Sequence, residues 1–241
     1  MQQIVLTLLA GGDGKAADLS LPYWLEASFS RPGRLTMEQF DARPDPRMIK
    51  THAMAKDFPC VLGPNGSIAS VGAKIITVVR DPRDTGVSFF HHCCKLEGYH
   101  GPWDHFAELF VEGQTTCGDY FKYHEGWWEQ YLKLGAKQML WVYYEDMKAD
   151  LASVVRQVAD FMGLAVSDSV VECTVAAAQF DSMSEQHKSS MPPGFFRKGQ
   201  IGDGIGMYSE VTMQRMHARM EQHLLHTPMF ARYGFGARTA S

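Results

Sequence analysis

The sequence predicts an α/β domain of the doubly wound type, in which helices cover both faces of a parallel sheet. Short apolar runs alternate along the chain with segments of helical periodicity, and this alternation is typical of parallel sheets. The length of 241 residues suits one domain with a large core. No internal repeat or low-complexity linker divides the sequence. We therefore expect residues 1–241 to form a single domain.

Three short apolar segments are candidate strands, because each is followed by polar residues. They cover residues 48–51, 75–79 and 139–143. Four segments show helical periodicity, and they cover residues 119–135, 150–163, 168–178 and 211–224. In the second of these, Asp150 is a candidate N-cap and Gly163 a candidate stop. Residues 187–207, which are rich in Gly, Ser and Pro, predict a long functional loop.

The composition is that of an ordinary globular protein, with 45% apolar and 21% charged residues. The net charge of −4 disfavours bulk binding of nucleic acid, so any basic site must be local. No apolar stretch approaches the ~20 residues of a membrane span, and the first residues lack the basic flank of a secretion signal. Five cysteines without C-x-x-C spacing indicate reduced thiols. We expect a cytoplasmic protein without nucleic-acid or membrane partners.

Residues 76–86 are the most informative segment. A β-branched run ends on Arg80, a turn with Pro82 follows, and a helix is expected to open through residues 87–89, with the Ser88 hydroxyl in its first turn. A strand–helix junction of this kind favours an anion, because the helix N-terminus presents unpaired N–H groups and a positive dipole. A second basic element, Arg197-Lys198-Gly199, indicates a ligand with more than one anionic group.

Two other segments resemble a phosphate loop and a metal site, but only in part. Residues 8–16 resemble a phosphate loop, but Leu9 stands where the first glycine is required and Ala16 offers no magnesium ligand. An exposed turn after a helix is the better interpretation. Within residues 91–94, His-His-Cys-Cys, His91 and Cys94 form the single i, i+3 pair and there is no i, i+4 pair, so these residues offer at most two metal ligands on one helix face. We interpret them as part of a helix that packs by an aromatic face, and no metal is predicted.

Four motifs together resemble the cytosolic sulfotransferases. They are Lys50-Thr51-His52, residues 80–88, residues 144–148, and residues 196–199 with Gly202-Asp203, and smaller similarities lie at residues 22–26 and 113–128. Their order and spacing match the family over nearly the whole chain. The resemblance implies a P-loop-like fold and transfer of a sulfuryl group from 3′-phosphoadenosine 5′-phosphosulfate to a hydroxyl or amine of a small molecule.

The resemblance also implies a set of nucleotide-binding residues. Arg80 and Ser88 would hold the 3′-phosphate, with help from Arg197, Lys198 and the backbone N–H of Gly199. Tyr144 would lie against the adenine, and Met183 matches an adenine-side methionine. Ala178 stands where the family usually has a hydroxyl residue. The alternatives from the residues alone are an ion pair of Arg80 with Asp81 or Asp84, a core position for Tyr144, and a solvated loop at residues 197–198.

His52 is the candidate general base, because imidazole has a pKa near neutrality. Lys50 lies two residues earlier and would share its face of a strand, where a cation can stabilise charge on the transferring group. A structural role is the alternative for His52. The acceptor is expected to be small and largely apolar, and phenol, steroid, fatty alcohol and amine remain open.

The sequence departs from the family in two places. The family's 5′-phosphosulfate loop, Tyr-Pro-Lys-Ser-Gly-Thr-Thr-Trp after an N-terminal strand, does not occur in it. In the family, residues resembling 2–5 follow that loop directly, so we expect the sheet to lack its first strand and this chain to transfer little sulfate. Residues 202–210 lack the tryptophan and lysine of the family's dimer segment, which leaves a homodimer open.

Two other functions compete with this interpretation. The first is a non-catalytic protein that binds 3′,5′-bisphosphate nucleotides through the same residues. The second is a nucleotide kinase or NTPase, which would need a true phosphate loop and an acidic magnesium ligand. Glu145-Asp146 is the only weak candidate for that ligand.

Overall fold

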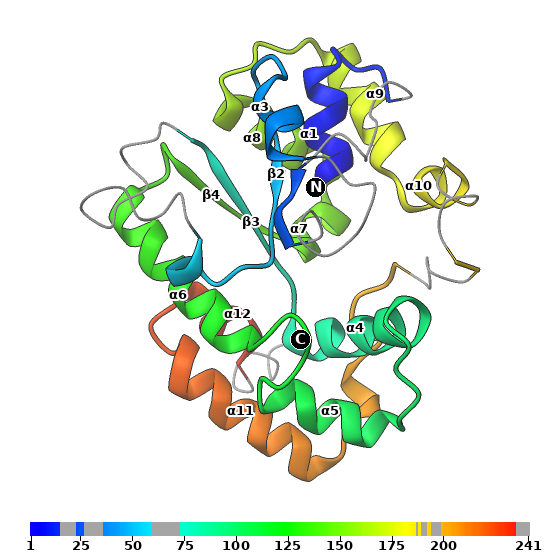
Figure 1. Ribbon diagram of the computed structural model, residues 1–241, viewed down its shortest axis with the longest axis vertical. Coiled ribbons are helices and arrows are strands. Elements are labelled where there is room, and N and C mark those ends of the chain that lie inside the picture. Colours follow the sequence, from blue (N-terminus) through cyan, green and yellow to red (C-terminus); the bar gives the residue numbers. More distant parts are fainter. Residues whose placement is uncertain are drawn as a thin grey trace. The chain divides into compact units, whose positions relative to one another are not determined.

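The structure, a computed structural model, describes residues 1–14, 23–26, 36–58, 73–186, 188, 192–193 and 199–234. The chain divides into two compact units (Figure 1). The first comprises Met1–Ala53 and Asp150–Ser182, and the second comprises Met54–Ala149 and Met183–Ser241.

Three helices pack on one another in the first unit: α1 (Gln2–Leu9), α8 (Leu151–Met162) and α9 (Asp168–Ala178). The Asp150 carboxylate caps α8 by accepting the Ser153 N–H at 2.9 Å. Gly163 ends this helix with a φ of +79°, a left-handed conformation that glycine adopts without strain. The predicted cap and stop of α8 are therefore confirmed, and so are the predicted bounds of α9.

The segment after α1 is a turn, as predicted. Gly11 and Gly12 both have positive φ angles, and the buried Gln3 side chain donates to the Gly14 carbonyl at 3.2 Å. Residues 15 and 16 of the imitated phosphate loop lie outside the described residues.

The first unit also holds a short parallel sheet formed by β1 (Tyr23–Trp24) and β2 (Ile49–Lys50), with Trp24 opposite Lys50. The strand predicted at 48–51 is thus shorter than expected. A short helix, α3 (Met37–Asp41), precedes β2. Its first turn is held by a capping box between Thr36 and Gln39.

The second unit is built on the parallel pair β3 (Ile75–Val79) and β4 (Met139–Tyr143), which align from Ile75 opposite Met139 to Val79 opposite Tyr143. Both strands have the predicted bounds. Within the described residues the strands form two parallel pairs. The predicted parallel pairing is therefore confirmed.

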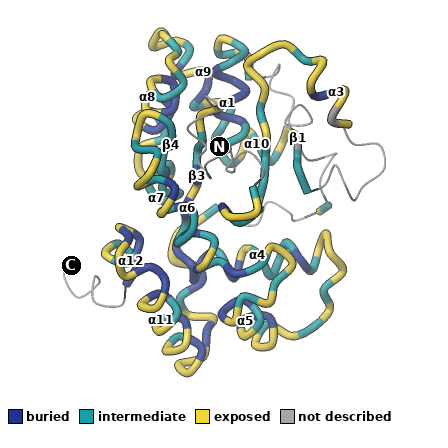
Figure 2. The backbone as a smooth tube through the Cα atoms, turned by 60° about the vertical axis from the view of Figure 1, so that its left-hand side comes forward, coloured by how far each residue is buried: buried dark blue, intermediate teal, exposed yellow. Residues whose placement is uncertain are grey.

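Helices and short 3₁₀ turns complete the described chain. They are the 3₁₀ turn Ala55–Asp57, α4 (Pro82–Leu96), α5 (Trp103–Val111), α6 (Tyr120–Leu134), α7 (Tyr144–Ala149), α10 (Phe180–Gln186), the 3₁₀ turn Ile205–Met207, α11 (Glu210–Leu224) and α12 (Pro228–Tyr233). The main core of the second unit lies where α4, α5, α6 and α11 meet (Figure 2). Phe106, Phe110, Phe121 and Met216 are buried in it.

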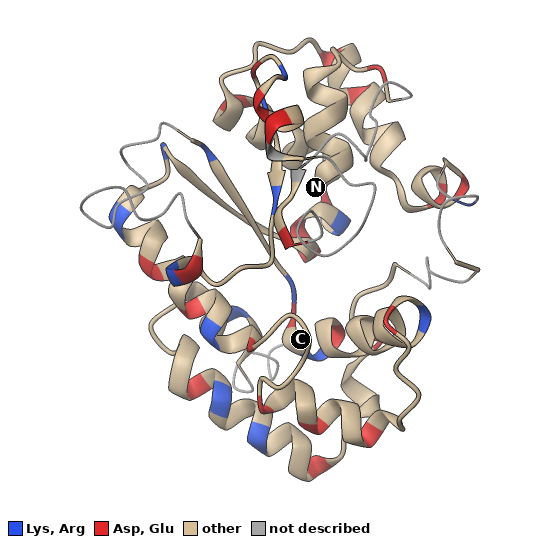
Figure 3. Ribbon diagram, viewed as in Figure 1, with Lys and Arg blue, Asp and Glu red and all other residues tan. Residues whose placement is uncertain are grey.

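Helix α6 begins after the N-cap Asp119 and ends at Gly135, as predicted. Both α6 and α11 carry acidic and basic residues (Figure 3). Arg219 of α11 pairs with Asp119, and His223 contacts Glu125 at 2.7 Å. In the part of the chain that the structure describes, no helix has the length and apolar character needed to cross a membrane.

Candidate active site

The junction between β3 and α4 differs from the prediction in one respect. Helix α4 begins at Pro82, and Asp81 is its N-cap. Ser88 is therefore well inside the helix rather than in its first turn, and its side chain is exposed. The physical reason is that the fixed φ of proline suits the first position of a helix, and the Asp81 carboxylate accepts the Arg83 N–H at 2.9 Å.

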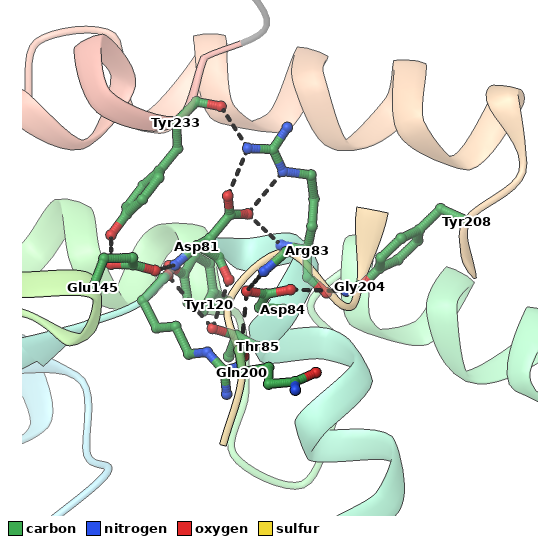
Figure 4. A network of polar contacts seen from close by, with 12 residues as sticks. Asp81, Arg83, Asp84, Thr85, Tyr120, Glu145, Gln200, Gly204, Tyr208 and Tyr233 are labelled. Atoms are coloured by element: carbon green, nitrogen blue, oxygen red, sulfur yellow. Dashed lines mark hydrogen bonds and ion pairs between the residues drawn. The ribbon is translucent and has the colours of Figure 1, made fainter. Parts of the chain in front are cut away.

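Asp81 also forms a two-pronged ion pair with Arg83 (Figure 4). The guanidinium Nε and Nη2 donate to the two carboxylate oxygens at 2.8 and 2.6 Å, and both side chains are buried. Burial lowers the pKa of Arg83, but its hydrogen bonds and ion pairing with Asp81 outweigh burial, so the net pKa is raised. Asp81 and Arg83 therefore form a buried ion pair with a structural role at the start of α4.

Arg80 has a different environment from Arg83. Its Nη2 donates to the Gln200 carbonyl at 3.1 Å and lies 3.7 Å from Asp84 Oδ2. Its guanidinium carbon lies 4.5 Å from the centre of the Tyr144 ring. Its Nε is buried and has no hydrogen-bond acceptor among the described residues. Burying a hydrogen-bond donor without an acceptor lowers the stability of the folded protein. An anionic oxygen of a ligand would supply an acceptor to the Arg80 guanidinium.

The side chains of Tyr120 and Glu145 bond to the backbone of Arg80 and Asp81 (Figure 4). The Tyr120 hydroxyl donates to the Arg80 carbonyl. Glu145 accepts the Asp81 N–H at 3.1 Å and the Tyr233 hydroxyl. Burial, and then the nearby Asp81 and Glu145, raise the pKa of Tyr120 well above its ordinary value, so it stays a donor. Glu145 is thus engaged in structural contacts.

Tyr144 is the first residue of α7 and follows β4 directly. It is half-buried; burial raises its pKa, while the neighbouring Arg80 acts in the opposite direction. Met183 lies half-buried on α10, and its assignment to the adenine stays a prediction. Gly199 has a φ of +61°. Arg197 and Lys198 lie outside the described residues.

A second cluster lies in the first unit, at the end of the β1–β2 sheet. Lys50 Nζ lies 4.1 Å from the centre of the Trp24 ring, and the His52 ring meets Trp24 edge-on at 5.9 Å. The two candidate catalytic side chains therefore contact the same indole, although His52 follows the strand rather than belonging to it. The His52 side chain is exposed.

Glu26 fixes the backbone of this cluster. Its Oε1 accepts the Thr51 hydroxyl at 2.6 Å and the His52 N–H at 2.5 Å. Burial raises the pKa of Glu26, but the hydrogen bonds from Thr51 and from the backbone, together with the nearby His52, outweigh burial and lower it. Sequence reasoning missed this role, and the similarity at residues 22–26 was the signal that could have found it.

The described residues contain no group of three or more His, Cys, Asp or Glu side chains that could hold a metal ion. His91 and Cys94 lie on α4, as predicted. On the same helix Phe90 packs edge-on against Trp103 and Phe106. The aromatic packing predicted for this segment is therefore confirmed.

These features define an α/β protein with a cationic strand–helix junction beside a tyrosine ring. The family model described as the sulfotransferase domain matches residues 14–227. The chain therefore belongs to the sulfotransferase family, as the sequence motifs predicted.

Named relatives agree with this assignment. Human sulfotransferase 6B1 is 31% identical over 194 residues, which cover 78% of this chain and 61% of the relative. Rabbit (Oryctolagus cuniculus) sulfotransferase 1C2 is 29% identical over 193 residues, which cover 75% of this chain and 62% of the relative. The chain thus spans about three fifths of the length of these relatives.

Solved structures confirm the predicted fold class. Mouse sulfotransferase SULT7A1 complexed with PAP has a TM-score of 0.73 at 24% identity, covering 84% of this chain and 74% of that protein. Retinol dehydratase in a complex with retinol and PAP has a TM-score of 0.73 at 23% identity, covering 94% of this chain and 77% of that protein. At these identities the likeness concerns the fold.

Proposed function

We propose that this chain belongs to a sulfotransferase that uses 3′-phosphoadenosine 5′-phosphosulfate and a small apolar acceptor with a hydroxyl or amine. Membership of the family supports the proposal. The bound PAP in two structures of the same fold supports the choice of nucleotide. A cytoplasmic location is part of the proposal.

The observation that carries the proposal is the environment of Arg80. Its Nε has no acceptor among the described residues, whereas Arg83, three residues later, is paired with Asp81. A phosphate oxygen of the nucleotide would supply the missing acceptor, and charge-assisted bonds of this kind are strong and directional. The Tyr144 ring beside Arg80 offers a flat surface for a base.

We assign the 3′-phosphate to Arg80, together with the backbone N–H of Gly199. Arg80 Nη2 donates to Gln200, the residue next to Gly199, so the two candidate donors belong to adjoining parts of one site. Ser88, Arg197 and Lys198 complete the assignment on the strength of the family motifs. Met183 is assigned to the adenine for the same reason.

In the proposed reaction, His52 takes the proton of the acceptor hydroxyl at an imidazole nitrogen. The donor, when bound, supplies a sulfuryl group on a phosphate leaving group. As the bond from the acceptor oxygen to sulfur forms, the bond from sulfur to the phosphate oxygen breaks. Lys50 offsets negative charge on the group in transfer, and the Trp24 ring holds its ammonium by a cation–π contact.

Calorimetric titration of the purified chain with adenosine 3′,5′-bisphosphate, with 5′-AMP as the control, tests the nucleotide assignment. We expect the bisphosphate to bind more tightly, because only it presents a 3′-phosphate to Arg80. Equal affinity for both nucleotides would contradict the proposal. Transfer of radioactive sulfate to a panel of phenols, steroids, fatty alcohols and amines then tests catalysis. Measurable transfer would exclude a non-catalytic binder, although residues 1–241 lack the family's 5′-phosphosulfate loop and are expected to transfer little.

A further inference from the structure

Asp84 is a buried carboxylate whose two oxygens bind a distant part of the chain. It is the third residue of α4, and only 1% of its side chain is exposed. Oδ2 accepts the Gly202 N–H at 2.7 Å, and Oδ1 accepts the Gly204 N–H at 2.8 Å. These N–H groups lie 118 and 120 residues further along the chain.

The contacts of Asp84 belong to a set that holds residues 200–208 on the first turn of α4 (Figure 4). The Tyr208 hydroxyl donates to the Arg83 carbonyl at 3.0 Å. A side chain at Gly204 would place its Cβ 2.3 Å from the Arg83 carbonyl oxygen, so the two backbones touch there. We call the two Asp84 hydrogen bonds, together with this backbone contact, the latch.

The latch lies between the two halves of the proposed nucleotide site. On one side Asp84 Oδ2 is 3.7 Å from Arg80 Nη2. On the other side Gly202 is three residues from Gly199. Arg80 Nη2 itself bonds the Gln200 carbonyl at 3.1 Å. A shift of residues 202–204 would therefore change the position of Gly199 relative to Arg80.

We propose that Asp84 is a positioning residue of the nucleotide site, which fixes the Gly199 backbone at the right distance from Arg80. The inference rests on the proposed function, because it assumes that both groups bind one 3′-phosphate. Asp84 itself makes no contact with the ligand in this proposal. The buried carboxylate is stabilised by the two N–H donors, by Arg80 and by the helix N-terminus.

The test compares Asp84→Asn with Asp119→Asn. Asp119 is a matched control, because it is also a buried carboxylate that accepts two backbone N–H groups and faces an arginine. Asn at 84 keeps one acceptor and places an amide donor against the other N–H group. We expect the ratio of the 5′-AMP and bisphosphate dissociation constants to fall about tenfold or more in Asp84→Asn, as for loss of one bond to a charged group.

Gly204→Ala disturbs the latch from its other side and should lower the same ratio without changing any charge. In Asp119→Asn we expect a lower melting temperature with an unchanged ratio. Amide hydrogen exchange at Gly202 and Gly204 should accelerate in Asp84→Asn, which shows whether the latch itself is lost. An unchanged ratio in both Asp84→Asn and Gly204→Ala would overturn the inference.

The failure of the proposed function would look different. In that case the unmodified chain would not distinguish the bisphosphate from 5′-AMP, and the positioning role of Asp84 would fall with it. Faster exchange at Gly202 and Gly204 in Asp84→Asn would then report only a structural contact.

Discussion

Arg80 and Arg83 are three residues apart and each forms an ion pair, Arg80 with Asp84 and Arg83 with Asp81, yet the sequence does not show that Arg80 keeps one buried donor without an acceptor. Arg83 is buried against Asp81. Arg80 keeps a buried Nε without an acceptor among the described residues, beside the Tyr144 ring. The difference follows from the N-cap geometry of α4, which turns the Asp81 carboxylate toward Arg83.

Arg80→Lys should weaken binding of adenosine 3′,5′-bisphosphate by about ten- to a hundredfold, because an ammonium cannot present a planar fork or stack on Tyr144 in the same way. Binding of 5′-AMP should change little. Calorimetry measures both affinities. Arg215→Lys is the control, since Arg215 is on α11 and pairs with Glu112. Equal weakening of both nucleotides would argue against a 3′-phosphate at Arg80.

His124 should make the protein sensitive to acid. It is buried on α6 with its ring 4.5 Å from that of Tyr120, and burial lowers its pKa to about 3. In the unfolded chain the pKa of a histidine is ~6.5. Between about pH 6.5 and 3, His124 is therefore protonated in the unfolded chain and neutral in the folded chain. Stability falls as the pH falls through this window, by roughly 2 kcal/mol at about pH 5.

Urea unfolding at pH 7 and pH 5 measures this effect. His124→Phe keeps an aromatic ring in the core and should lose about 2 kcal/mol less than the unmodified chain between the two pH values. His226→Gln changes an exposed histidine and should leave the difference as it was. If His124→Phe lost as much unfolding free energy between pH 7 and pH 5 as the unmodified chain, a group other than His124 would be responsible for the pH dependence.

At the level of elements, capping residues and buried faces set the stability. Asp150→Ala removes the carboxylate that accepts the Ser153 N–H and should cost about 1 kcal/mol of unfolding free energy. Asp160→Ala on the same helix changes an exposed residue and should cost much less. Urea unfolding compares them. Equal costs would show that the cap contributes nothing measurable.

Strand β3 offers a second comparison, because neighbouring valines point to opposite faces. Val79 is fully buried, whereas Val78 is 37% exposed. Val79→Ala should lower the free energy of unfolding by about 2 kcal/mol, because it removes buried apolar surface and leaves a cavity. Val78→Ala should lower it by less. Denaturant unfolding of the two variants measures the difference. A reversed order would mean that the burial of this strand differs from the structure.

The sequence predicts the helix and strand bounds that depend on residues within the same segment. The bounds of β3, β4, α8 and α9 follow from apolar runs, caps and stops that lie within each segment. The start of α4 was wrong because Pro82 suits a turn and a first helical position equally well. The bonds of Glu26 to His52 and of Asp84 to Gly202 join residues 26 and 118 positions apart. Such long-range contacts leave no periodic trace in a single sequence.

At the scale of the whole molecule, the expectation of a single domain stays a prediction. Two-stranded sheets are marginal by themselves in water, and each unit contains one among its described residues. We therefore expect differential scanning calorimetry to show one cooperative transition, with equal calorimetric and van't Hoff enthalpies. Two separate transitions would contradict a single domain, and would assign independent stability to the two units.

The closeness of Gly204 to Arg83 also constrains which sequences this backbone can accept. The family pattern has a tryptophan after Gly-Asp, whereas here the residue after Gly202-Asp203 is Gly204. Since even a methyl group at 204 would meet the Arg83 carbonyl oxygen at 2.3 Å, no larger residue fits until the loop has moved. To accept the family's tryptophan at position 204, the protein must therefore first move residues 202–204 away from Arg83. In a saturation library selected for folded protein, Gly204→Trp should be among the least frequent variants.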